Sequence, residues 1–534
     1  MKKSNLPIIF LHLLITTTFS SSASADNPTY AAFVHCLTQQ NIPPNISSKI
    51  VFPPNAPQFP AALHSYIRNR RFNTTATRKP AFIVLPTADP HVSAAVLCSA
   101  RLRIHLKIRS GGHDYEATSY TSDDDFALLD LSEFRSIRIN SSAKTATVGP
   151  GATLGELYYH IWKNSKTLAF PAGVCPTVAV GGHIGGAGYG NMLRKHGLTV
   201  DHVSDVTIVI GNGSILNRAS MGPDLFWALL GGGPASFGVI LSYDIELVRV
   251  PRTVTVFQVK KYRSDRAAEA VYEYENIVSS MPDELFIRVL IQPVTGPENG
   301  KTVRATFIGQ YLGRAKNLLN ITSRLFPSLG LTNESCHEIP WIQSVLYWDD
   351  RENGLDRTPK ELLNRELNTA SFVKRKSDYV KKTIPIVELE AIFDKVIQLG
   401  KVGMVFNSYG GINSRISSNA TAFPHREGNL FKIQYSVNWD NEADSEKYVE
   451  QSRELYEFMT KYVSENPREA YLNYRDLDIG VMPARENSYE IGKVYGEKYF
   501  KDNFRKLVSV KTKVDPDNFF RNEQSIPTWG KKRL

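Results

Sequence analysis

The sequence predicts an α+β fold with more than one domain, and three observations carry that prediction. The chain has 534 residues, several times the usual length of a single domain. Hydrophobic residues make up 42% of it and charged residues 22%, a globular composition that argues against a disordered chain, a fibre or a coiled coil. From residue 80 onward, short β-rich runs alternate with helical ones, and no repeat period appears.

The first 25 residues have the pattern of a secretory signal peptide. Two lysines precede an apolar run over residues 6–19, and small residues ending in Ala23-Ser24-Ala25 follow it. The run is too short to predict a membrane span, and no later segment is apolar enough for one. We therefore expect residues 1–25 to be removed and the protein to enter the secretory pathway.

Asparagine and cysteine positions agree with secretion. Seven Asn-X-Ser/Thr sequons indicate a glycoprotein and lie at Asn45, Asn73, Asn140, Asn212, Asn320, Asn333 and Asn419. The four cysteines are Cys36, Cys98, Cys175 and Cys336, which allow three pairings if all are bridged. Cys36 and Cys98 lie in helical contexts, where an oxidising compartment favours a bridge, whereas Cys175 lies in a glycine-rich loop.

The charge balance argues against a nucleic-acid partner. Lysine and arginine total 63 against 53 acidic residues, which gives a formal net charge of +10. Nucleic-acid binding would require a clustered basic stripe with interleaved aromatic residues, and no stretch has that pattern. The prediction is a soluble basic protein of the cell exterior.

Within residues 26–250, the expected strands and helices alternate. A β-branched run predicts a strand at residues 81–85, a helix follows at 91–101, and a second strand covers 105–108. A helix opens after Thr153, which is a plausible N-cap. Further strands are expected at residues 126–131, 136–139, 145–148 and 206–210.

A second domain is expected over residues 251–480, because the texture of the sequence changes near Val250-Pro251. Longer helical periods there, with strands between them, predict a sheet covered by helices. The expected helices are 265–281, 387–399 and 444–463, and the expected strands are 286–292, 303–311 and 430–439. Residues 481–534 are rich in polar and aromatic side chains and are expected to pack back on the first domain.

Two loops carry candidate chemistry. Residues 109–115 read Arg-Ser-Gly-Gly-His-Asp-Tyr after a predicted strand, where paired glycines let backbone N–H groups approach a ligand and His113 would project at it. A tight turn with a hydrogen-bonded histidine is the ordinary alternative. Residues 171–190 concentrate glycine around Cys175 and His183, which predicts backbone lying flat against a large planar or phosphorylated ligand. A merely flexible loop is the alternative there.

Other chemistries fit these loops poorly. The strand–G-x-G-x-x-G–helix context of a dinucleotide fingerprint and the Gly-Lys-Ser/Thr of a P-loop are both missing. No C-x-x-C or H-x-x-x-H spacing completes a metal site around Cys175 and His183, so no metal is predicted. A serine hydrolase is disfavoured because no Gly-x-Ser-x-Gly elbow appears.

Together with the segment 518–527, Asn-Phe-Phe-Arg-Asn-Glu-Gln-Ser-Ile-Pro, these loops resemble the plant berberine bridge enzyme-like flavoproteins of the vanillyl-alcohol-oxidase/PCMH superfamily. The resemblance covers nearly all of residues 30–527 in order. It implies a PCMH-type FAD-binding domain of two subdomains over residues 26–250, a substrate domain over 251–480, and a C-terminal segment over 481–534 that returns to the FAD-binding domain.

The resemblance also implies an FAD bound by two covalent bonds, through His113 at the 8α position and Cys175 at C6. It implies a Cys36–Cys98 disulfide and a free Cys336. A small Val178 resembles the oxygen-permissive members of the family, and His183 is expected to stabilise the negative charge of reduced flavin. The remaining positions expected to bind the cofactor are Arg109, Ser110, Gly111, Gly112, Gly181, Gly182 and Asn518.

By the same resemblance, the substrate site contains Tyr115, Tyr189, Lys432, Gln434 and Tyr474, with Tyr474 as the base. A phenol has an ordinary pKa near ~10, which an ammonium a few Å away would lower, and Lys432 is the candidate ammonium. Because side chains alternate along a strand, Lys432 and Gln434 are expected to share one face of the strand at 430–439.

The function implied is a secreted oxidase that converts an alcohol, monolignol-like or carbohydrate, to a carbonyl while oxygen is reduced to hydrogen peroxide. An oxidative cyclase or cycloaddition enzyme of plant specialised metabolism, acting on an alkaloid or a prenylated phenol, is the alternative. A secreted binding protein without catalysis is a third. The expected partners are a small-molecule substrate and molecular oxygen, the expected state is a monomer, and the expected destination is the cell wall, a vacuole or a vesicle derived from the endoplasmic reticulum.

Several positions depart from the usual pattern of the family. Small residues replace glycine at Ala117, Ala179 and Ala187, and these changes are expected to keep the flavin. Leu230 and Pro234 flank a glycine run that usually begins with arginine and continues with glycine. Arg415 stands where an acidic residue is usual, which bears on substrate class or on local loop packing.

Overall fold

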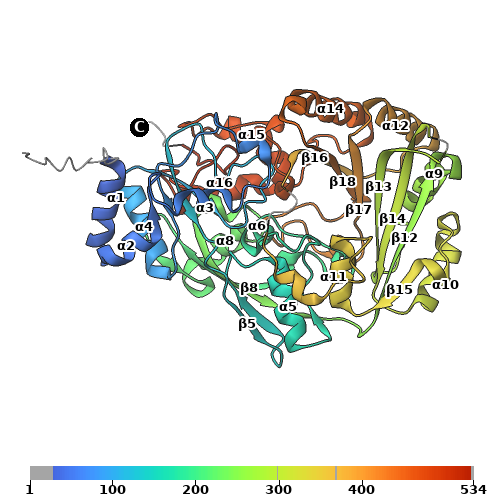
Figure 1. Ribbon diagram of the computed structural model, residues 1–534, viewed down its shortest axis with the longest axis horizontal. Coiled ribbons are helices and arrows are strands. Elements are labelled where there is room, and N and C mark those ends of the chain that lie inside the picture. Colours follow the sequence, from blue (N-terminus) through green and yellow to red (C-terminus); the bar gives the residue numbers. More distant parts are fainter. Residues whose placement is uncertain (1–27, 298, 367–369, 531–534) are drawn as a thin grey trace, which may run out of the picture.

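The computed structural model describes residues 28–297, 299–366 and 370–530, and its elements are arranged as in Figure 1. The expected signal peptide, residues 1–25, lies outside the described residues. N-terminal helices lie at one end of the molecule and a large sheet at the other, with the remaining elements between them (Figure 1). Within the described part of the chain, no helix has the length and apolar character needed to cross a bilayer.

The N-terminal sheet has four strands in the order β1 (Val51–Phe52), β2 (Ile83–Val84), β4 (Phe126–Asp130) and β3 (His105–Arg109). The last three are parallel, and every residue of β4 is buried, as expected for a parallel strand covered on both faces. The helices α1 (Pro28–Gln39) and α4 (Asp89–Arg101) pack on this sheet and are joined by the Cys36–Cys98 disulfide.

A second, antiparallel sheet has five strands in the order β5 (Ile137–Asn140), β6 (Thr145–Val148), β10 (Val239–Glu246), β8 (Val203–Val209) and β9 (Ile215–Leu216). The helix α5 (Leu154–Asn164) packs beside it. Thr153 is its N-cap, as predicted, and forms a capping box in which Glu156 N–H donates to Thr153 Oγ1 and Thr153 N–H donates to Glu156 Oε2. The short pair β7 (Leu168–Ala169) and β11 (Val248–Arg249) leads to the next sheet.

The third sheet has seven antiparallel strands. Their order is β15 (Cys336–Ile339), β12 (Val254–Tyr262), β14 (Lys301–Tyr311), β13 (Leu285–Thr295), β17 (Gly403–Ser408), β18 (Phe431–Trp439) and β16 (Phe372–Val380). One face is covered by α9 (Ala267–Ile277), α12 (Ile386–Leu399) and α14 (Ser445–Phe458), which lie along its outer side in Figure 1. This is the predicted sheet covered by helices.

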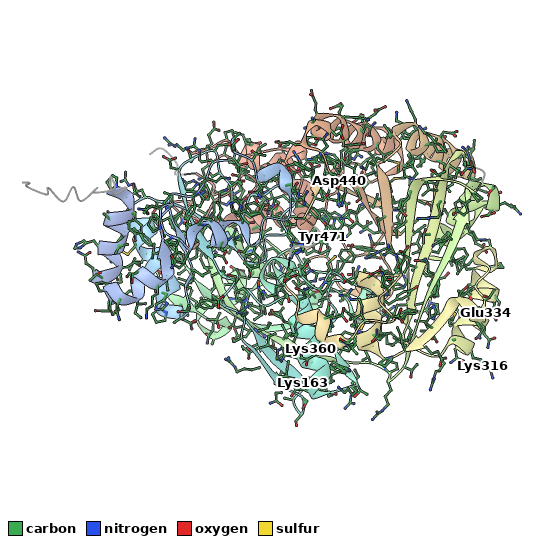
Figure 2. The ribbon with its side chains drawn as sticks, viewed as in Figure 1. Lys163, Lys316, Glu334, Lys360, Asp440 and Tyr471 are labelled. Carbon is green, nitrogen blue, oxygen red and sulfur yellow. A yellow bond between two sulfur atoms is a disulfide. The ribbon has the colours of Figure 1, made fainter. Side chains whose placement is uncertain are left out.

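Alternation along β18 decides which side chains face the middle of the molecule. Ile433 and Tyr435 belong to the core under the covering helices. Lys432 and Gln434 therefore point to the opposite face, as expected from the period of a strand. Figure 2 places Tyr471 in the middle of the molecule, whereas the labelled Lys163 and Lys316 lie at its outside.

The C-terminal segment returns to the first two sheets. The helices α15 (Tyr489–Phe500) and α16 (Asn503–Val514) share one core with α8 (Arg218–Leu229). Lys511 Nζ is buried and donates to the carbonyl oxygens of Ser236 and Phe520. The glycine tract also contains a short helix that the sequence reasoning did not expect, α6 (Val180–Gly185).

Candidate active site

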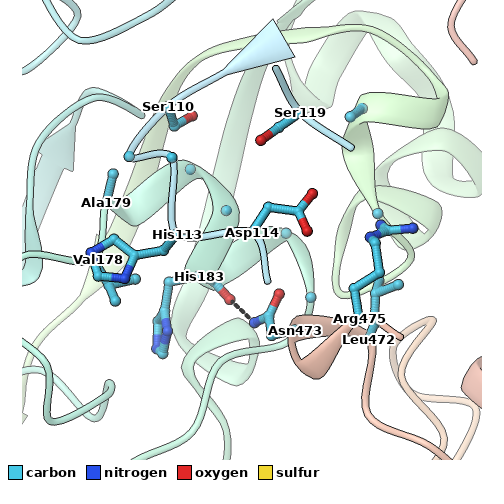
Figure 3. Close-up of a pocket in the computed structure, with 18 of the residues that line it drawn as sticks. Ser110, His113, Asp114, Ser119, Val178, Ala179, His183, Leu472, Asn473 and Arg475 are labelled. Atoms are coloured by element: carbon cyan, nitrogen blue, oxygen red, sulfur yellow. Dashed lines mark hydrogen bonds between the residues drawn. The ribbon is translucent and has the colours of Figure 1, made fainter. Parts of the chain in front are cut away.

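A cavity of about 370 Å³ lies where these three parts of the chain meet. Its volume is within the range of small-molecule sites. The walls come from the loop after β3, the glycine tract with α6, strands β13 and β18, the turn at residues 471–475, and residues 521–522. Figure 3 shows the first two of these walls together with the turn.

The two candidate loops pack so closely that side chains larger than hydrogen are excluded between them. A Cβ added at Gly111 would lie 2.7 Å from Ala179 Cβ, and one added at Gly181 would lie 2.6 Å from Ser110 Oγ. Gly112 has a φ of +61° and approaches the Tyr66 carbonyl, so only glycine fits there. The loop after β3 is thereby fixed against the start of α6, with its backbone forming one wall of the cavity.

His113 and Cys175, the two candidate attachment residues, come from different loops and line the same cavity. His113 Nε2 lies 3.2 Å from Thr177 Oγ1. Burial, assisted by the charge of Arg68, lowers the pKa of His113 to about 3, so the ring is neutral at physiological pH. Cys175 is accessible along the cavity wall. Burial and Asp349 raise the pKa of its thiol, while nearby arginines oppose that shift.

His183 lies deeper in the same wall and is also neutral. Burial and the charge of Lys432 lower its pKa to about 3. The backbone N–H of Gly173 donates to His183 Nε2 over 3.1 Å, so the ring proton sits on Nδ1. His183 can therefore act as a hydrogen-bond donor but not as a cation.

Four tyrosines gather at the substrate end of the cavity. Tyr189 and Tyr474 share a hydrogen bond between their hydroxyl groups, and the rings of Tyr115 and Tyr474 lie 5.9 Å apart between centroids. Gln434 Nε2 donates to Tyr115 Oη over 3.1 Å. Lys432 Nζ lies 3.4 Å from the ring centroids of both Tyr189 and Tyr471. The structure thus brings all five predicted substrate-site residues together.

At the substrate end of the cavity, burial favours the uncharged forms of Tyr474 and Lys432. It raises the pKa of Tyr474 well above its ordinary value, and Tyr189 and Tyr115 add to that shift. Burial also lowers the pKa of Lys432 well below its ordinary value, and its Nζ has no hydrogen-bond partner among the described residues. Arg288 on β13 lowers the pKa of both Tyr189 and Tyr474. Lys432 lies over the ring faces, and Arg288, in place of the predicted Lys432, is the cation that lowers the pKa of Tyr474.

Two residues that were expected to bind the cofactor do not line the cavity. Arg109 is buried beneath the N-terminal sheet, where its Nε donates to Asp130 Oδ2 and its Nη1 donates to the Leu63 carbonyl, each over 2.8 Å. Asn518 lies in a turn after α16 and has a φ of +52°. Arg109 therefore joins β3 to β4 and to the Leu63 segment, whereas Asn518 Oδ1 is buried without a partner among the described residues. The other predicted positions, Ser110, Gly111, Gly112, Val178, Gly181 and Gly182, line the cavity.

Two family models match the stretches of sequence that contain the glycine tract and the Tyr474 turn. A model of the FAD binding domain matches residues 80–218, and a model described as berberine and berberine like matches residues 470–527. Berberine bridge enzyme-like 21 of Arabidopsis thaliana is 53% identical to the chain over 97% of either protein. The chain belongs to the berberine bridge enzyme-like family. It is therefore an FAD-dependent oxidoreductase with the PCMH-type fold of that family.

Solved structures of berberine bridge enzyme-like proteins have the same fold. Wild-type Phl p 4.0202 of grass pollen, a glucose dehydrogenase, is 41% identical, with a TM-score of 0.87 over 93% of this chain and 100% of its own. An isoleucine-to-valine variant of Phl p 4, a glucose oxidase, is also 41% identical, with a TM-score of 0.88 over 93% of this chain and 100% of its own.

The cavity suits the FAD that the berberine bridge enzyme-like family binds. Its glycine wall leaves room for a large planar group, and Ser110 and the backbone around it offer donors to phosphate. Arg475 lines the cavity, and its buried Nη1 has no partner among the described residues, as expected for a guanidinium that pairs with an anionic cofactor group.

Sequence reasoning missed three further residues of this berberine bridge enzyme-like site. Asn473 Nδ2 donates to the His183 carbonyl over 2.9 Å, which ties the Tyr474 turn to the glycine tract (Figure 3). Arg475 and Asn473 flank Tyr474 in the recognised motif and were passed over there. The signal for Arg288 was available as a single charge in an apolar strand run, Leu-Phe-Ile-Arg-Val-Leu-Ile.

The departures from the family pattern have different structural settings. Ala117 and Ala187 are fully buried with φ values of 58° and 79°, a conformation that glycine adopts more readily. Pro234 lines the cavity beside Gly233. Arg415 lies outside the cavity lining and forms a surface ion pair with Asp283, which accounts for its charge by local loop packing.

Proposed function

We propose that this enzyme is a secreted oxidase whose FAD is attached at both His113 and Cys175 and which oxidises an alcohol group of a carbohydrate to a carbonyl. The observation that carries the proposal is the placement of both attachment residues and the Tyr115, Tyr189 and Tyr474 group on one cavity. When bound, the flavin supplies the hydride acceptor and passes the electrons on to oxygen, which leaves as hydrogen peroxide.

Attachment at two points is supported by the chemistry of the two side chains. His113 is neutral, so one of its two ring nitrogens carries a lone pair that can form a bond. Arg288, Arg68 and Arg375 favour the thiolate form of Cys175, which is the nucleophilic form. A cofactor held at two points has a single orientation in the cavity, which fixes the reacting atoms near the tyrosines.

Proton removal is assigned to Tyr474. Its oxygen shares a hydrogen bond with Tyr189, so a proton taken from the substrate hydroxyl can be shared between the two phenols. Arg288 stabilises the phenolate that results from loss of the tyrosine proton, since it lowers the pKa of both groups. Gln434 orients Tyr115 from the opposite wall.

The charge at the substrate end favours a carbohydrate over an alkaloid. Three arginines act on Cys175 there, Arg288, Arg68 and Arg375, and their charges oppose that of the Asp349 carboxylate. An alkaloid carries a positive charge at neutral pH and would be repelled, whereas a sugar that bears carboxylates would be attracted. The glucose-oxidising activity of the relative Phl p 4 also supports a sugar substrate. A ring-forming reaction on a neutral phenol remains the second candidate.

Oxygen as the acceptor is supported by Val178. This residue is half-buried and lines the cavity three positions after Cys175. Among the Phl p 4 structures, the wild type is a glucose dehydrogenase and an isoleucine-to-valine variant is a glucose oxidase. By the family resemblance, the residue three positions after the linked cysteine controls oxygen access, and a valine there would leave room for oxygen beside the flavin.

Secretion is supported by surface features. The asparagines of all seven sequons are exposed, so each is accessible to a glycan. The Cys36–Cys98 disulfide fits an oxidising compartment. The proposed domains remain residues 26–250, 251–480 and 481–534.

The base assignment is tested by Tyr474→Phe. We expect flavin reduction under anaerobic mixing to slow by about 100-fold or more, because general base catalysis typically contributes that much. In the unaltered enzyme the rate should rise with pH, since the phenolate is the active form and burial raises the pKa of Tyr474. The variant should lose that rise. An unchanged rate in Tyr474→Phe would remove the assignment.

The substrate assignment is tested by peroxide release from a neutral oligosaccharide, a carboxylated oligosaccharide of equal length, a monolignol and a benzylisoquinoline alkaloid. We expect the carboxylated sugar to give the highest kcat/KM and the alkaloid to give no peroxide. Colour that stays with acid-denatured enzyme, and is lost only when His113 and Cys175 are both replaced by alanine, would support double attachment. Absence of peroxide with every substrate would indicate a binding protein instead.

A further inference from the structure

A buried ion cluster lies at the edge of the seven-stranded sheet, outside the cavity. Lys374 on β16 is 2% exposed. Its Nζ lies 2.5 Å from Glu116 Oε1, 2.8 Å from Asp476 Oδ1 and 3.2 Å from Asp478 Oδ2. Burial opposes the charge of Lys374, but Asp476 and Glu116 outweigh it and raise the pKa of the lysine above its ordinary value. The lysine is therefore charged in the folded enzyme.

The carboxylates bonded to Lys374 belong to the two loops that carry the reacting tyrosines. Glu116 directly follows Tyr115, and Asp476 lies two residues after Tyr474. One ammonium group on a rigid strand thus links the backbone beside Tyr115 to the backbone beside Tyr474. The two tyrosine rings lie 5.9 Å apart at the cavity, so any change in the separation of the loops is passed directly to them.

The Lys374 ammonium is needed to hold two buried carboxylates, those of Glu116 and Asp476, close together. Burial raises the pKa of Glu116 and Asp476 adds to that shift, whereas Lys374 opposes it, so the two carboxylates repel each other across the lysine. Without Lys374, the remaining cation near Glu116 is Arg71, at 3.8 Å. Removing the shared ammonium from a buried site would force the carboxylates to separate or to take up a proton. Either response changes the spacing of the two loops.

Lys376, two residues along the same strand, provides an internal comparison. It is 1% exposed and contacts Asp476 at 2.5 Å and Asp478 at 2.9 Å. Its described contacts do not include Glu116, so it stays within the Tyr474 loop and does not bridge the two loops. Lys374 and Lys376 are therefore the same residue type, are equally buried and lie on the same strand. They differ in that Lys374 links the two loops and Lys376 does not.

We propose that Lys374 is a positioning residue that sets the spacing between Tyr115 and Tyr474. This inference rests on the proposed function, because it takes those two tyrosines as substrate-site residues. It assigns to Lys374 no contact with substrate or cofactor. The lysine acts through Glu116 and Asp476, and it ties the substrate sheet to the loop that carries His113.

The test compares Lys374→Met with Lys376→Met in the flavin-loaded enzyme. A displacement of about 1 Å at a reacting group costs on the order of 100-fold in rate, so we expect Lys374→Met to slow flavin reduction by about 10- to 100-fold. Lys376→Met should have a much smaller effect on that rate, although both variants lose a buried charge and a comparable amount of stability. The pH dependence of flavin reduction should be altered in Lys374→Met and retained in Lys376→Met.

A second pair of measurements keeps the proposal falsifiable if Lys374→Met fails to fold. Glu116→Gln weakens the same link while leaving Lys374 paired with Asp476, and it should also slow flavin reduction. Where Lys374→Met folds, the double variant that combines it with Glu116→Gln should be no slower than Lys374→Met alone, because the two substitutions remove the same link. Equal rate losses in Lys374→Met and Lys376→Met, or an unaffected rate in Glu116→Gln, would overturn the inference.

The failure of this inference can be separated from failure of the proposed function. An unchanged rate in Tyr474→Phe contradicts the base assignment, whichever lysine variant is slow. If Tyr474→Phe is slow, adding Lys374→Met to it should cost less than it costs in the unaltered enzyme, because the lysine acts through that tyrosine. An additive loss in the combined variant would mean that Lys374 has a general structural role, and it would overturn the positioning role.

Discussion

At the scale of single residues, burial decides the protonation state of the candidate site. It keeps His113 and His183 neutral and raises the pKa of Tyr474. Arginine is the side chain that keeps its charge under such conditions, because its guanidinium is not deprotonated in proteins. Arg288 is therefore the cation on which the phenol pair depends, and the field at the substrate end is positive.

Val178 provides a prediction at this scale. Leucine in its place adds a methylene group to the cavity wall beside Cys175. One methylene in a pocket typically changes a rate by about tenfold or more, so we expect the reaction of reduced enzyme with oxygen to slow by about tenfold. Flavin reduction by substrate should change little, because the tyrosines are not displaced. Stopped-flow mixing of reduced enzyme with oxygenated buffer measures the first rate, and Val178→Ala is the control. Equal rates of reaction with oxygen for the Val178→Leu variant and the unaltered enzyme would contradict the proposed role of Val178 in oxygen access.

At this scale, the sequence predicts site residues that lie within a recognised motif. It does not predict site residues that lie outside any motif. Neighbours in the chain and a family pattern placed His113, Cys175 and Tyr474 at one site. Arg288 escaped because its partners are distant in sequence, and only the antiparallel register of β13 brings it to the tyrosines. Arg109 was misplaced for the opposite reason, since proximity to His113 in sequence put it at the site although its side chain turns away to Asp130.

At the scale of elements, alternation along strands places the chemistry. Gln434 on β18 lines the cavity and Lys432 packs against the Tyr189 and Tyr471 rings, because Ile433 and Tyr435 fill the core beneath the helices. The strand β16 was not expected, since Lys374, Lys376 and Asp378 occupy its inward positions, where an apolar pattern is normal. Those charges are tolerated because loops and neighbouring strands bring counter-charges to them. The charged residues of this ion-pair network therefore obscure the apolar alternation by which a strand is recognised in a sequence.

The helix α9 provides a prediction about stability and pH. Glu275 is buried on it, its Oε2 accepts from the backbone N–H of Ile384, and its Oε1 has no partner among the described residues. Burial raises its pKa to about 8. Because this value lies above that of the unfolded chain, near ~4.3, the folded state binds more protons between these pH values. The stability linked to Glu275 is therefore present at low pH and declines as pH rises toward 8.

Glu275→Gln should remove this decline. The amide keeps the acceptor for Ile384 and carries no charge, so we expect the free energy of unfolding to rise by about 4 kcal/mol at pH 8 and to be nearly unchanged at pH 4. Urea unfolding at the two pH values measures the difference. Glu273→Gln, on the same helix, is the control for a general effect of charge removal. A gain of equal size at both pH values would contradict the raised pKa.

At the scale of the whole molecule, the cavity exists because three parts of the chain meet. The two smaller sheets supply the cofactor wall, the seven-stranded sheet supplies Arg288 and Gln434, and the C-terminal segment closes the remaining side. The sequence predicted this division, since the texture changes near residue 250 and the final motif is recognisable. It did not predict how the parts contact one another, because ion pairs such as Lys107–Glu523 join residues that no local pattern relates.

Gln524 provides a prediction at this scale. Its Nε2 donates to the carbonyl oxygens of Asp476 and Gly480 over 2.8 and 2.7 Å, and Tyr499 donates to its Oε1. Gln524→Leu would leave these buried groups unpaired, which costs about 1–3 kcal/mol for each group lost. We expect lower thermal stability together with slower flavin reduction, because the Tyr474 turn loosens.

The control for Gln524 is Tyr495→Phe, which removes one hydrogen bond within the C-terminal segment, from Tyr495 Oη to the Ser525 carbonyl. It should lower thermal stability by a smaller amount and leave the rate of flavin reduction unchanged. A slow rate in both variants would mean that general loosening of the segment, and not the hold on the Tyr474 turn, limits the reaction.

Closure of the cavity by Arg521 and Asn522 has a consequence for biosynthesis. These residues emerge from the ribosome after every other segment of the wall, so a nascent chain presents an open trough to FAD until translation is almost finished. Under the proposed secretion and double attachment, covalent capture of the cofactor would follow translocation, and the lumen in which the polypeptide completes folding would need its own supply of the dinucleotide.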